Sequence, residues 1–239
     1  MATMHPATVA AHFPLLNDQW LLRLHCPTLI SQTLPGHSLV LNDTELTVAL
    51  IKRGSDDVEL YYTRTKDHPL RRLAEHQTIE IALAGKPIVI GDTTTPRIVV
   101  VADASGFAAA QAFVADQSEA GQPPALSLFD IGKTFPFRPR PSRFLVSGLP
   151  GHVIAAHPLC EEWGVASRLA EQEETHGCWE GCVHELLAAH VNHHTEQPAH
   201  VLAIGSAHLI AAVEKLTTGI AQITTHLIPP SQHLHKSGV

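Results

Sequence analysis

Short runs of apolar and β-forming residues, separated by turn-forming residues, follow one another through the first ninety positions of the chain. Residues 58–63 (VELYYT) are rich in β-forming side chains that alternate with other residues, and residues 78–83 (TIEIAL) repeat this pattern. Further short apolar runs occupy residues 20–25, 38–41 and 46–51. Five or six strands at this spacing predict an antiparallel barrel or sandwich. A short helix is expected at residues 69–75, with Pro69 in its first turn.

The pattern changes after Pro96. Residues 97–103 (RIVVVAD) form a continuous apolar run, which is typical of a strand buried on both faces. Residues 107–117 (FAAAQAFVADQ) then have the pattern of a helix. The later segments alternate in the same way, with strands expected at residues 125–129, 143–146, 164–170, 199–204 and 220–227 and helices at residues 179–191 and 207–217. Such alternation indicates βαβ units and a parallel sheet.

The sequence therefore predicts two domains and a tail. The first is an antiparallel β-barrel over residues 1–95, the second is an α/β domain with a parallel sheet over residues 96–229, and the tail covers residues 230–239. A chain of 239 residues with 44% hydrophobic and 16% charged residues can bury the cores that two such domains require.

Charge and composition exclude several classes of protein. A net charge of −7 argues against nucleic-acid binding, because no basic surface is available to displace counterions from phosphates. No apolar run approaches the roughly 18 to 20 residues that span a bilayer, and the N-terminus lacks the basic and apolar regions of a signal peptide. A cytoplasmic protein is therefore expected, and its four cysteines are expected to be reduced thiols.

Five segments, taken in order, resemble those of ferredoxin–NADP reductase-like proteins. They cover about residues 15–225 and read LLRLHCPTLISQTLPGHSLVLN, VELYYTRTKDHPLRRLAEHQTIEIALAGKP, VVVADASGFAAAQAF, SRLAEQEETHGCWEGCVHELL and HVLAIGSAHLIAAV. This family includes the electron-transfer subunit of dihydroorotate dehydrogenase. The resemblance implies an oxidoreductase that carries FAD or FMN between the two domains, takes NAD(P)H on the α/β domain and exchanges electrons with a protein partner.

The resemblance also implies which residues bind these cofactors. One group corresponds to the loop that meets the flavin pyrophosphate, and two tight turns correspond to those that meet NAD(P). In this chain they are Arg64, Thr65 and Lys66 for the flavin, and Ser105, Gly106, Gly205 and Ser206 for NAD(P).

Several family motifs are altered in this chain. The strand that usually carries Arg-x-Tyr-Ser for the flavin is TELTVALIK here, residues 44–52, with Thr47 as the only hydroxyl near the right place. The loop at Arg64 has lost its glycine, and Ile204 stands where the family often has a cysteine. Asp103 ends the first α/β strand, where its carboxylate would repel a pyrophosphate unless it binds ribose hydroxyls.

These departures leave a second interpretation open. The basic residues near Arg64 can form a solvated face, and Asp103, Ser105 and Ser206 can simply cap helices. The chain would then be a non-catalytic relative without bound flavin, which acts as an assembly or regulatory subunit of a larger complex.

A third interpretation concerns the segment HGCWEGCVH. If this segment is helical, Cys178 and Cys182 lie on one face and form a candidate metal-binding pair, as in a metal-dependent sensor. The alternative is that both are structural cysteines at the start of a helix, with no metal. No hydrolase motif of the G-x-S-x-G or H-E-x-x-H type is present.

Overall fold

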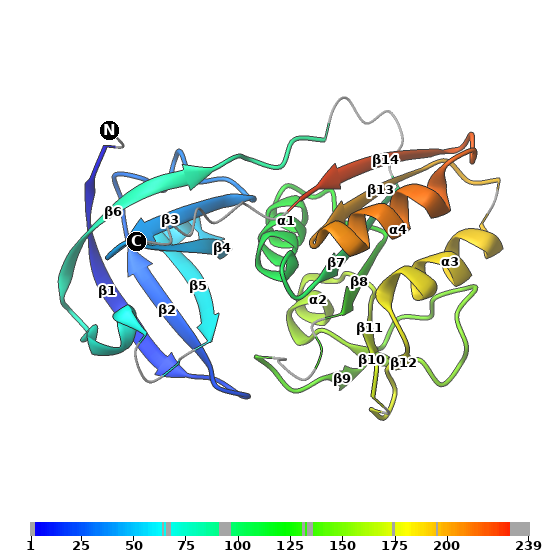
Figure 1. Ribbon diagram of the computed structural model, residues 1–239, viewed down its shortest axis with the longest axis horizontal. Coiled ribbons are helices and arrows are strands. Elements are labelled where there is room, and N and C mark those ends of the chain that lie inside the picture. The colour runs from blue at the N-terminus through cyan, green and yellow to red at the C-terminus, as the bar shows by residue number, and fades with distance from the viewer. Residues whose placement is uncertain are drawn as a thin grey trace, which may run out of the picture.

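The computed structural model describes residues 3–63, 65, 68–90, 97–130, 132, 136–173, 175–194 and 196–229. Within these residues the chain forms a β-barrel and an α/β unit that lie side by side (Figure 1). Both parts of the predicted fold class are therefore confirmed. The predicted domain boundary between residues 95 and 96 and the predicted tail at residues 230–239 lie outside the described residues.

Six antiparallel strands close the barrel in the order β1-β2-β5-β4-β3-β6. They are β1 (His5–Pro14), β2 (Gln19–His25), β3 (His37–Leu41), β4 (Thr44–Lys52), β5 (Asp57–Thr63) and β6 (Thr78–Gly85). The β3–β4 hairpin turns through Asn42 and Asp43, both at positive φ, as a two-residue hairpin requires. Alternate side chains such as Leu22, Leu60 and Ile81 fill the interior.

Two short 3₁₀ helices complete this part of the chain: η1 (Arg53–Ser55) and η2 (Pro69–Arg72). The second stands where a short helix was expected, and His68 caps it by accepting a hydrogen bond from the Leu70 N–H. The pattern analysis missed β1, because its sequence HPATVAAHFP carries a proline near each end and little alternation.

The second unit contains a parallel six-stranded sheet in the order β12-β11-β8-β7-β13-β14 and a separate two-stranded pair, β9 with β10. The sheet strands are β7 (Ile98–Asp103), β8 (Leu126–Asp130), β11 (Ser167–Glu171), β12 (Trp179–Glu180), β13 (Ala199–Ile204) and β14 (Ile223–Ile228), and the pair is β9 (Arg140–Pro141) and β10 (Ala155–Ala156).

Helices cover both faces of this sheet. They are α1 (Phe107–Glu119), α2 (Pro158–Trp163), α3 (Val183–His193) and α4 (Ala207–Thr217). The first two lie on the side that faces the barrel, and the last two lie on the far side (Figure 1). Successive residues of β7 point to opposite faces, so that Val100 packs toward α1 and Val101 packs toward α3 and α4. None of the described helices is long and apolar enough to cross a membrane.

Two expectations about this unit were wrong, and one element was missed. Residues 143–146 form no strand, because side chains of Ser142, Glu161 and Arg168 take up the backbone groups of Arg143 and Phe144. Residues 179–182 are not helical, because Trp179 and Glu180 pair with β11 and α3 starts only at Val183. The short helix α2 was not anticipated.

Candidate functional site

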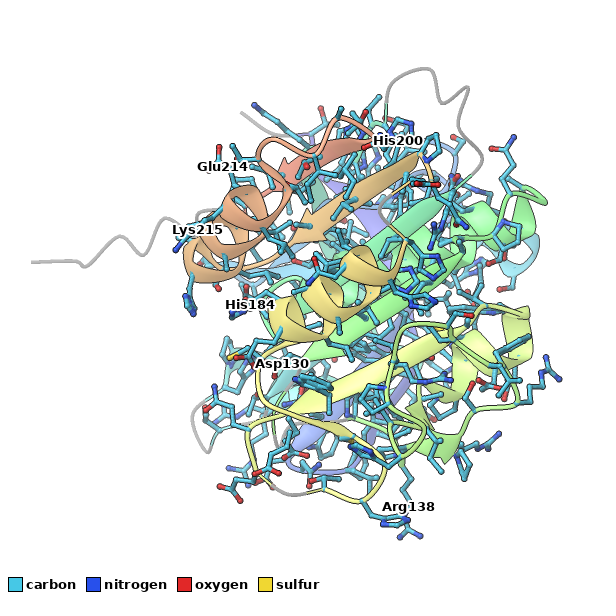
Figure 2. All side chains as sticks on the ribbon, turned by 90° about the vertical axis from the view of Figure 1, so that its right-hand side faces the viewer. Asp130, Arg138, His184, His200, Glu214 and Lys215 are labelled. Carbon is cyan, nitrogen blue, oxygen red and sulfur yellow. The ribbon has the colours of Figure 1, made fainter. Side chains whose placement is uncertain are left out.

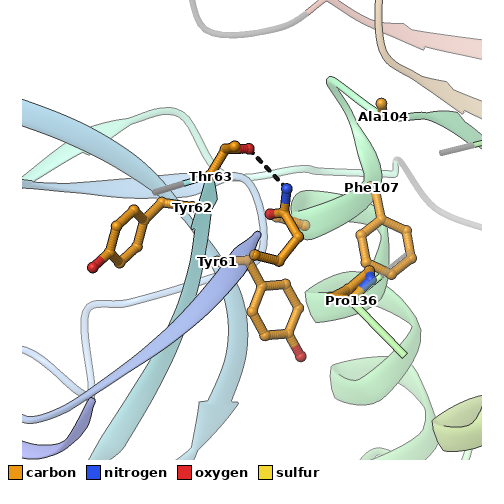
Figure 3. A pocket seen from close by; sticks show the side chains of 8 residues that line it. Tyr61, Tyr62, Thr63, Ala104, Phe107 and Pro136 are labelled. Atoms are coloured by element: carbon orange, nitrogen blue, oxygen red, sulfur yellow. Dashed lines mark hydrogen bonds between the residues drawn. The ribbon is translucent and has the colours of Figure 1, made fainter. Parts of the chain in front are cut away.

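A cleft of about 380 Å³ lies where the end of β5 meets the start of α1. Its size falls within the usual range for small-molecule sites. Residues from the barrel and the α/β unit contribute about equally to it: Gln19, Tyr61, Tyr62, Thr63, Ala104, Phe107, Ala108 and Pro136. Figure 3 shows Tyr61 of β5 and Phe107 of α1 on opposite sides of the cleft, whereas the Tyr62 side chain points away from it.

The alternation of β5 explains this arrangement of the two tyrosines. Tyr62 belongs to the barrel core, so its neighbour Tyr61 must point outward, toward α1. At the end of the strand, the Gln19 side chain donates a hydrogen bond of 2.7 Å to the Thr63 hydroxyl. The cleft therefore has aromatic walls and a polar edge.

Behind the cleft, a buried polar network joins the two units. The Gln111 side chain of α1 is 1% exposed, and its Nε2 donates to the Ala49 carbonyl of β4 at 3.0 Å and to the Tyr61 hydroxyl at 3.1 Å. Its Oε1 lies 3.1 Å from Nε2 of His157, and the Cys160 N–H donates to Nδ1 of His157 at 3.3 Å.

Burial determines the protonation of this network. His157 is surrounded by the rings of Phe107, Phe129, Phe137 and Trp163. Removal from water lowers the pKa of His157 to about 3 and raises the pKa of Tyr61 to about 12. At neutral pH the imidazole is therefore uncharged and the phenol keeps its proton.

The buried histidine predicts an acid-sensitive stability. Its pKa is lower in the folded chain than in the unfolded chain, so it stabilises the fold above about pH 6.5 and loses that contribution as the pH falls. Between pH 7 and pH 4.5 we expect His157 to account for a loss of about 2 kcal/mol in the free energy of unfolding, measured by urea denaturation.

The control for this prediction is the His157→Asn variant, which cannot titrate in this range. Its free energy of unfolding should fall less between the same two pH values than that of the wild type. His190, whose pKa is lowered to about 4 mainly by burial, remains in both proteins. Equal pH slopes in wild type and variant would contradict the prediction.

Strand β4, which corresponds to the flavin-binding strand of the resemblance, is covered by α1. Ala49 is fully buried and its carbonyl accepts the hydrogen bond from Gln111. Val48 points into the barrel core. A ligand in the cleft would therefore contact β5 and α1 rather than β4.

The two predicted dinucleotide turns meet at the carboxyl edge of the sheet, around Asp103. One carboxylate oxygen of Asp103 accepts from the Ser105 N–H at 3.0 Å and from the Ser105 hydroxyl at 2.7 Å. The other oxygen accepts from the Ser206 N–H at 3.0 Å, and the Ser206 hydroxyl caps α4 by accepting from the Leu209 N–H. Donors that a phosphate would require are thus bonded to the protein's own carboxylate.

The glycines of these turns are required by packing. A Cβ atom at Gly106 would lie 2.0 Å from the Ile204 carbonyl oxygen, and one at Gly205 would lie 2.4 Å from a carboxylate oxygen of Asp103. The start of α1 therefore approaches the end of β13 so closely that only glycine fits. This contact explains both glycines without a bound nucleotide.

Acidic and soft side chains line a second, smaller crevice at this edge, of about 180 Å³. Asp103, Asp130, Cys182 and His184 contribute to it, and Figure 2 shows Asp130 and His184 near each other at the start of α3. Burial raises the pKa of Asp130, and the nearby charges of Asp103 and Glu171 raise it further. Two carboxylates at this position disfavour a pyrophosphate.

The remaining predicted site residues are dispersed. Thr65 is exposed, and Arg64 and Lys66 lie outside the described residues. Cys178 is buried in the core on the barrel-facing side of the sheet, whereas Cys182 precedes α3, where its N–H donates to Glu185 at 2.9 Å. The condition under which the two thiols would share a helical face is therefore not met, because α3 begins only after Cys182. Within the described ranges, no group of three histidine, cysteine or acidic residues could hold a metal ion.

Sequence analysis did not single out Tyr61, Gln111 or His157. Gln111 offered the one usable signal, since it is the only polar side chain among residues 107–115, the first nine residues of α1. Its partners lie 50 and 46 residues away in the chain, and nothing in the local pattern marks either of them.

Comparison with protein families finds no match, and comparison with curated protein sequences finds none either. Solved structures do match. The FAD/NAD-binding domain of nitric oxide dioxygenase from Vibrio cholerae is 10% identical, with a TM-score of 0.60 and coverage of 95% of this chain and 99% of that one. A ferredoxin NADP⁺ reductase from Neisseria gonorrhoeae with bound FAD and NADP gives the same identity, TM-score and coverage.

A cytochrome P450 reductase from Amycolatopsis is similar to the same extent, with 12% identity, a TM-score of 0.61 and coverage of 96% of this chain and 72% of that one. At these identities the likeness concerns the fold. The chain therefore has the two-domain ferredoxin reductase-like fold, and the resemblance noted in its sequence is confirmed at that level.

Proposed function

We propose that this protein is a ferredoxin reductase-like electron-transfer protein that binds a flavin, FAD or FMN, with its ring in the cleft between β5 and α1 and exchanges electrons with a protein partner. The observation that carries the proposal is the cleft itself. It lies between the two units and has the aromatic side chains of Tyr61 and Phe107 as its walls.

The lining of the cleft fits a flat, partly polar ring. Aromatic side chains favour stacking against such a ring, and a cleft of about 380 Å³ is large enough for it. Thr63, Gln19 and the phenol of Tyr61 supply hydrogen-bonding groups in or beside the cleft. The phosphate end of a flavin would extend toward the loop at Thr65, which Arg64 and Lys66 flank in the sequence.

A bound flavin would itself supply the acceptance and release of electrons. The chain's own residues would bind and orient the ring. Phe107 would pack against a face of the ring and Tyr61 would contact its edge, and the buried contact of α1 with β4 would keep water from the side of the cleft near Gln111. A protein partner would reach the ring through the open side of the cleft.

We assign no dinucleotide to the turns at Ser105 and Ser206. Their amides already donate to Asp103, and a pyrophosphate would have to displace that carboxylate. In this proposal the electrons therefore reach the flavin from a protein, and NAD(P)H does not bind with its pyrophosphate at these turns.

A second candidate function follows from the packing of α1 against β4. Because α1 lies directly against the strand that corresponds to the usual flavin site, the two units can also form a closed scaffold without a cofactor. The protein would then be a non-catalytic relative that serves as an assembly or regulatory subunit of a complex.

A flavin titration separates the two candidates. We expect the purified protein to show flavin absorption bands, or to gain them when FMN or FAD is added. At a flavin concentration of about 100 times the dissociation constant, the melting temperature should rise by roughly 5 to 10 °C. If the protein is colourless, and if FMN, FAD and riboflavin all leave its melting temperature unchanged, the flavin proposal is overturned and the second candidate function stands.

Two variants locate the binding site. Ala108→Phe places a large ring in the cleft and should abolish the flavin-dependent rise in melting temperature. Ala211→Phe makes the same change on the exposed surface of α4, on the far side of the sheet, and should leave the rise unchanged. Equal flavin binding in both variants would place the flavin outside this cleft.

A further inference from the structure

In the buried network behind the cleft, the donor and the acceptor of each hydrogen bond are fixed, because backbone groups bond to the network at two points. The Cys160 N–H can only donate, so Nδ1 of the neutral His157 must accept, and the ring proton must lie on Nε2. Nε2–H can then only donate to Oε1 of Gln111. The hydrogen-bonding roles of the imidazole follow from this one amide.

The second fixed point is the carbonyl of Ala49, which can only accept. The Gln111 atom 3.0 Å from it must therefore be the amide nitrogen, which agrees with the orientation that His157 imposes from the other side. The same nitrogen donates to the Tyr61 hydroxyl at 3.1 Å. Because Gln111 is 1% exposed and held on both sides, its amide cannot flip without breaking two buried hydrogen bonds.

The Tyr61 hydroxyl therefore accepts from Gln111 and keeps its own proton for another acceptor. In the described part of the chain, Gln111 is the only hydrogen-bond partner of this hydroxyl. Tyr61 is partly exposed and lines the cleft. A phenol that has accepted one hydrogen bond also becomes a better donor.

We propose that Tyr61 is a fixed hydrogen-bond donor at the cleft, and that it selects planar ligands that carry an acceptor, a carbonyl oxygen or an unprotonated ring nitrogen, at the edge facing β5. This inference rests on the proposed flavin function, since a flavin ring has acceptors of both kinds. Gln111 and His157 are positioning residues, which act on the ligand only through Tyr61.

The test compares Tyr61→Phe with Ser118→Ala in an FMN titration. Each variant removes one hydroxyl group, but Ser118 lies near the other end of α1, where its hydroxyl donates to the Val114 carbonyl at 2.7 Å. Tyr61→Phe keeps the aromatic wall and removes the donor, so FMN affinity should fall roughly 3- to 10-fold, the value of one neutral hydrogen bond. The absorption bands of bound FMN should shift, and Ser118→Ala should change neither quantity.

Gln111→Glu tests the direction of the network. A carboxyl group at this position offers an oxygen in place of the nitrogen that donates to Tyr61, so the phenol would donate to residue 111 instead of to the ligand. FMN affinity should fall as much as in Tyr61→Phe, and the double variant should be no weaker than either single one. Circular dichroism and thermal melts confirm that each variant is folded.

The outcomes separate the two proposals. If the wild type binds FMN and Tyr61→Phe binds it within twofold with unchanged absorption bands, the donor role is overturned and the flavin proposal stands. If the wild type binds no FMN, FAD or riboflavin, both the proposed function and the ligand class inferred here are overturned. If the losses of FMN affinity in Tyr61→Phe and Gln111→Glu add up in the double variant, the two residues make separate contacts with the ligand. That result would overturn the positioning role of Gln111.

Discussion

Gly106→Ala is expected to lower the free energy of unfolding by about 3 kcal/mol or more. The added Cβ would lie 2.0 Å from the carbonyl oxygen and 2.3 Å from the carbonyl carbon of Ile204, and 2.8 Å from the Gly205 nitrogen. All three are backbone atoms at the end of β13, which is paired with a strand on each side, so no side-chain rotation can relieve the contact. Urea denaturation followed by circular dichroism measures the loss.

Gly54→Ala is the matched control, since a Cβ at that position meets no atom within 4 Å and the residue does not need a positive φ. It should change the free energy of unfolding by less than about 0.5 kcal/mol. The result also decides why Gly106 is present. If Gly106→Ala were as stable as the wild type and only lost affinity for NADH or NADPH, the turn would be a nucleotide site rather than a packing contact.

Asp103→Ala is expected to lower the free energy of unfolding by about 2 to 3 kcal/mol and to change which ligands the protein binds. The substitution removes the acceptor of two backbone amides and one hydroxyl, and hydrogen bonds to a charged group are the stronger kind. It also frees the amides of Ser105 and Ser206 at the starts of α1 and α4. We expect pyrophosphate to raise the melting temperature of Asp103→Ala and to have no effect on the wild type.

Asp116→Ala is the control for the loss of charge. Asp116 lies on the same side of the sheet, on α1, and pairs with Arg53 at 3.1 Å, with both side chains about a third exposed. A surface pair of this kind contributes less than about 1 kcal/mol. If pyrophosphate, NADH or NADPH stabilised the wild type as much as it stabilised the Asp103→Ala variant, the Asp103 carboxylate would not be the group that prevents binding at these turns.

Much of the fold could be predicted from the chain's pattern because the signals were local. The continuous apolar run at residues 97–103 and the helical pattern after it identified β7 and α1 close to their observed bounds. Strand β1 and helix α2 could not be recognised in the same way. One is a strand without clear alternation between prolines, and the other has only six residues.

The site was less predictable. Sequence analysis identified Ser105, Gly106, Gly205 and Ser206 as residues of special turns, and the structure does bring the two turns together. Whether their amides remain free was a separate question, because it depends on the side chain of Asp103, which reaches a turn 103 residues away. The sequence raised both possibilities for this aspartate, and only the folded structure shows which amides donate hydrogen bonds to it.

The sequence by itself determined most of the order of elements, the two-unit layout and the absence from β4 of the Arg-x-Tyr-Ser pattern of the family that it resembles, because periodicity and residue type are properties of neighbouring positions. The tertiary structure decided that α1 covers β4, that Asp103 binds the amides of both predicted dinucleotide turns, and that Tyr61, Gln111 and His157 form one network beside the cleft. These features depend on contacts between residues 46 to 103 positions apart, whose geometry follows from packing the barrel against the sheet and leaves no trace in the local pattern.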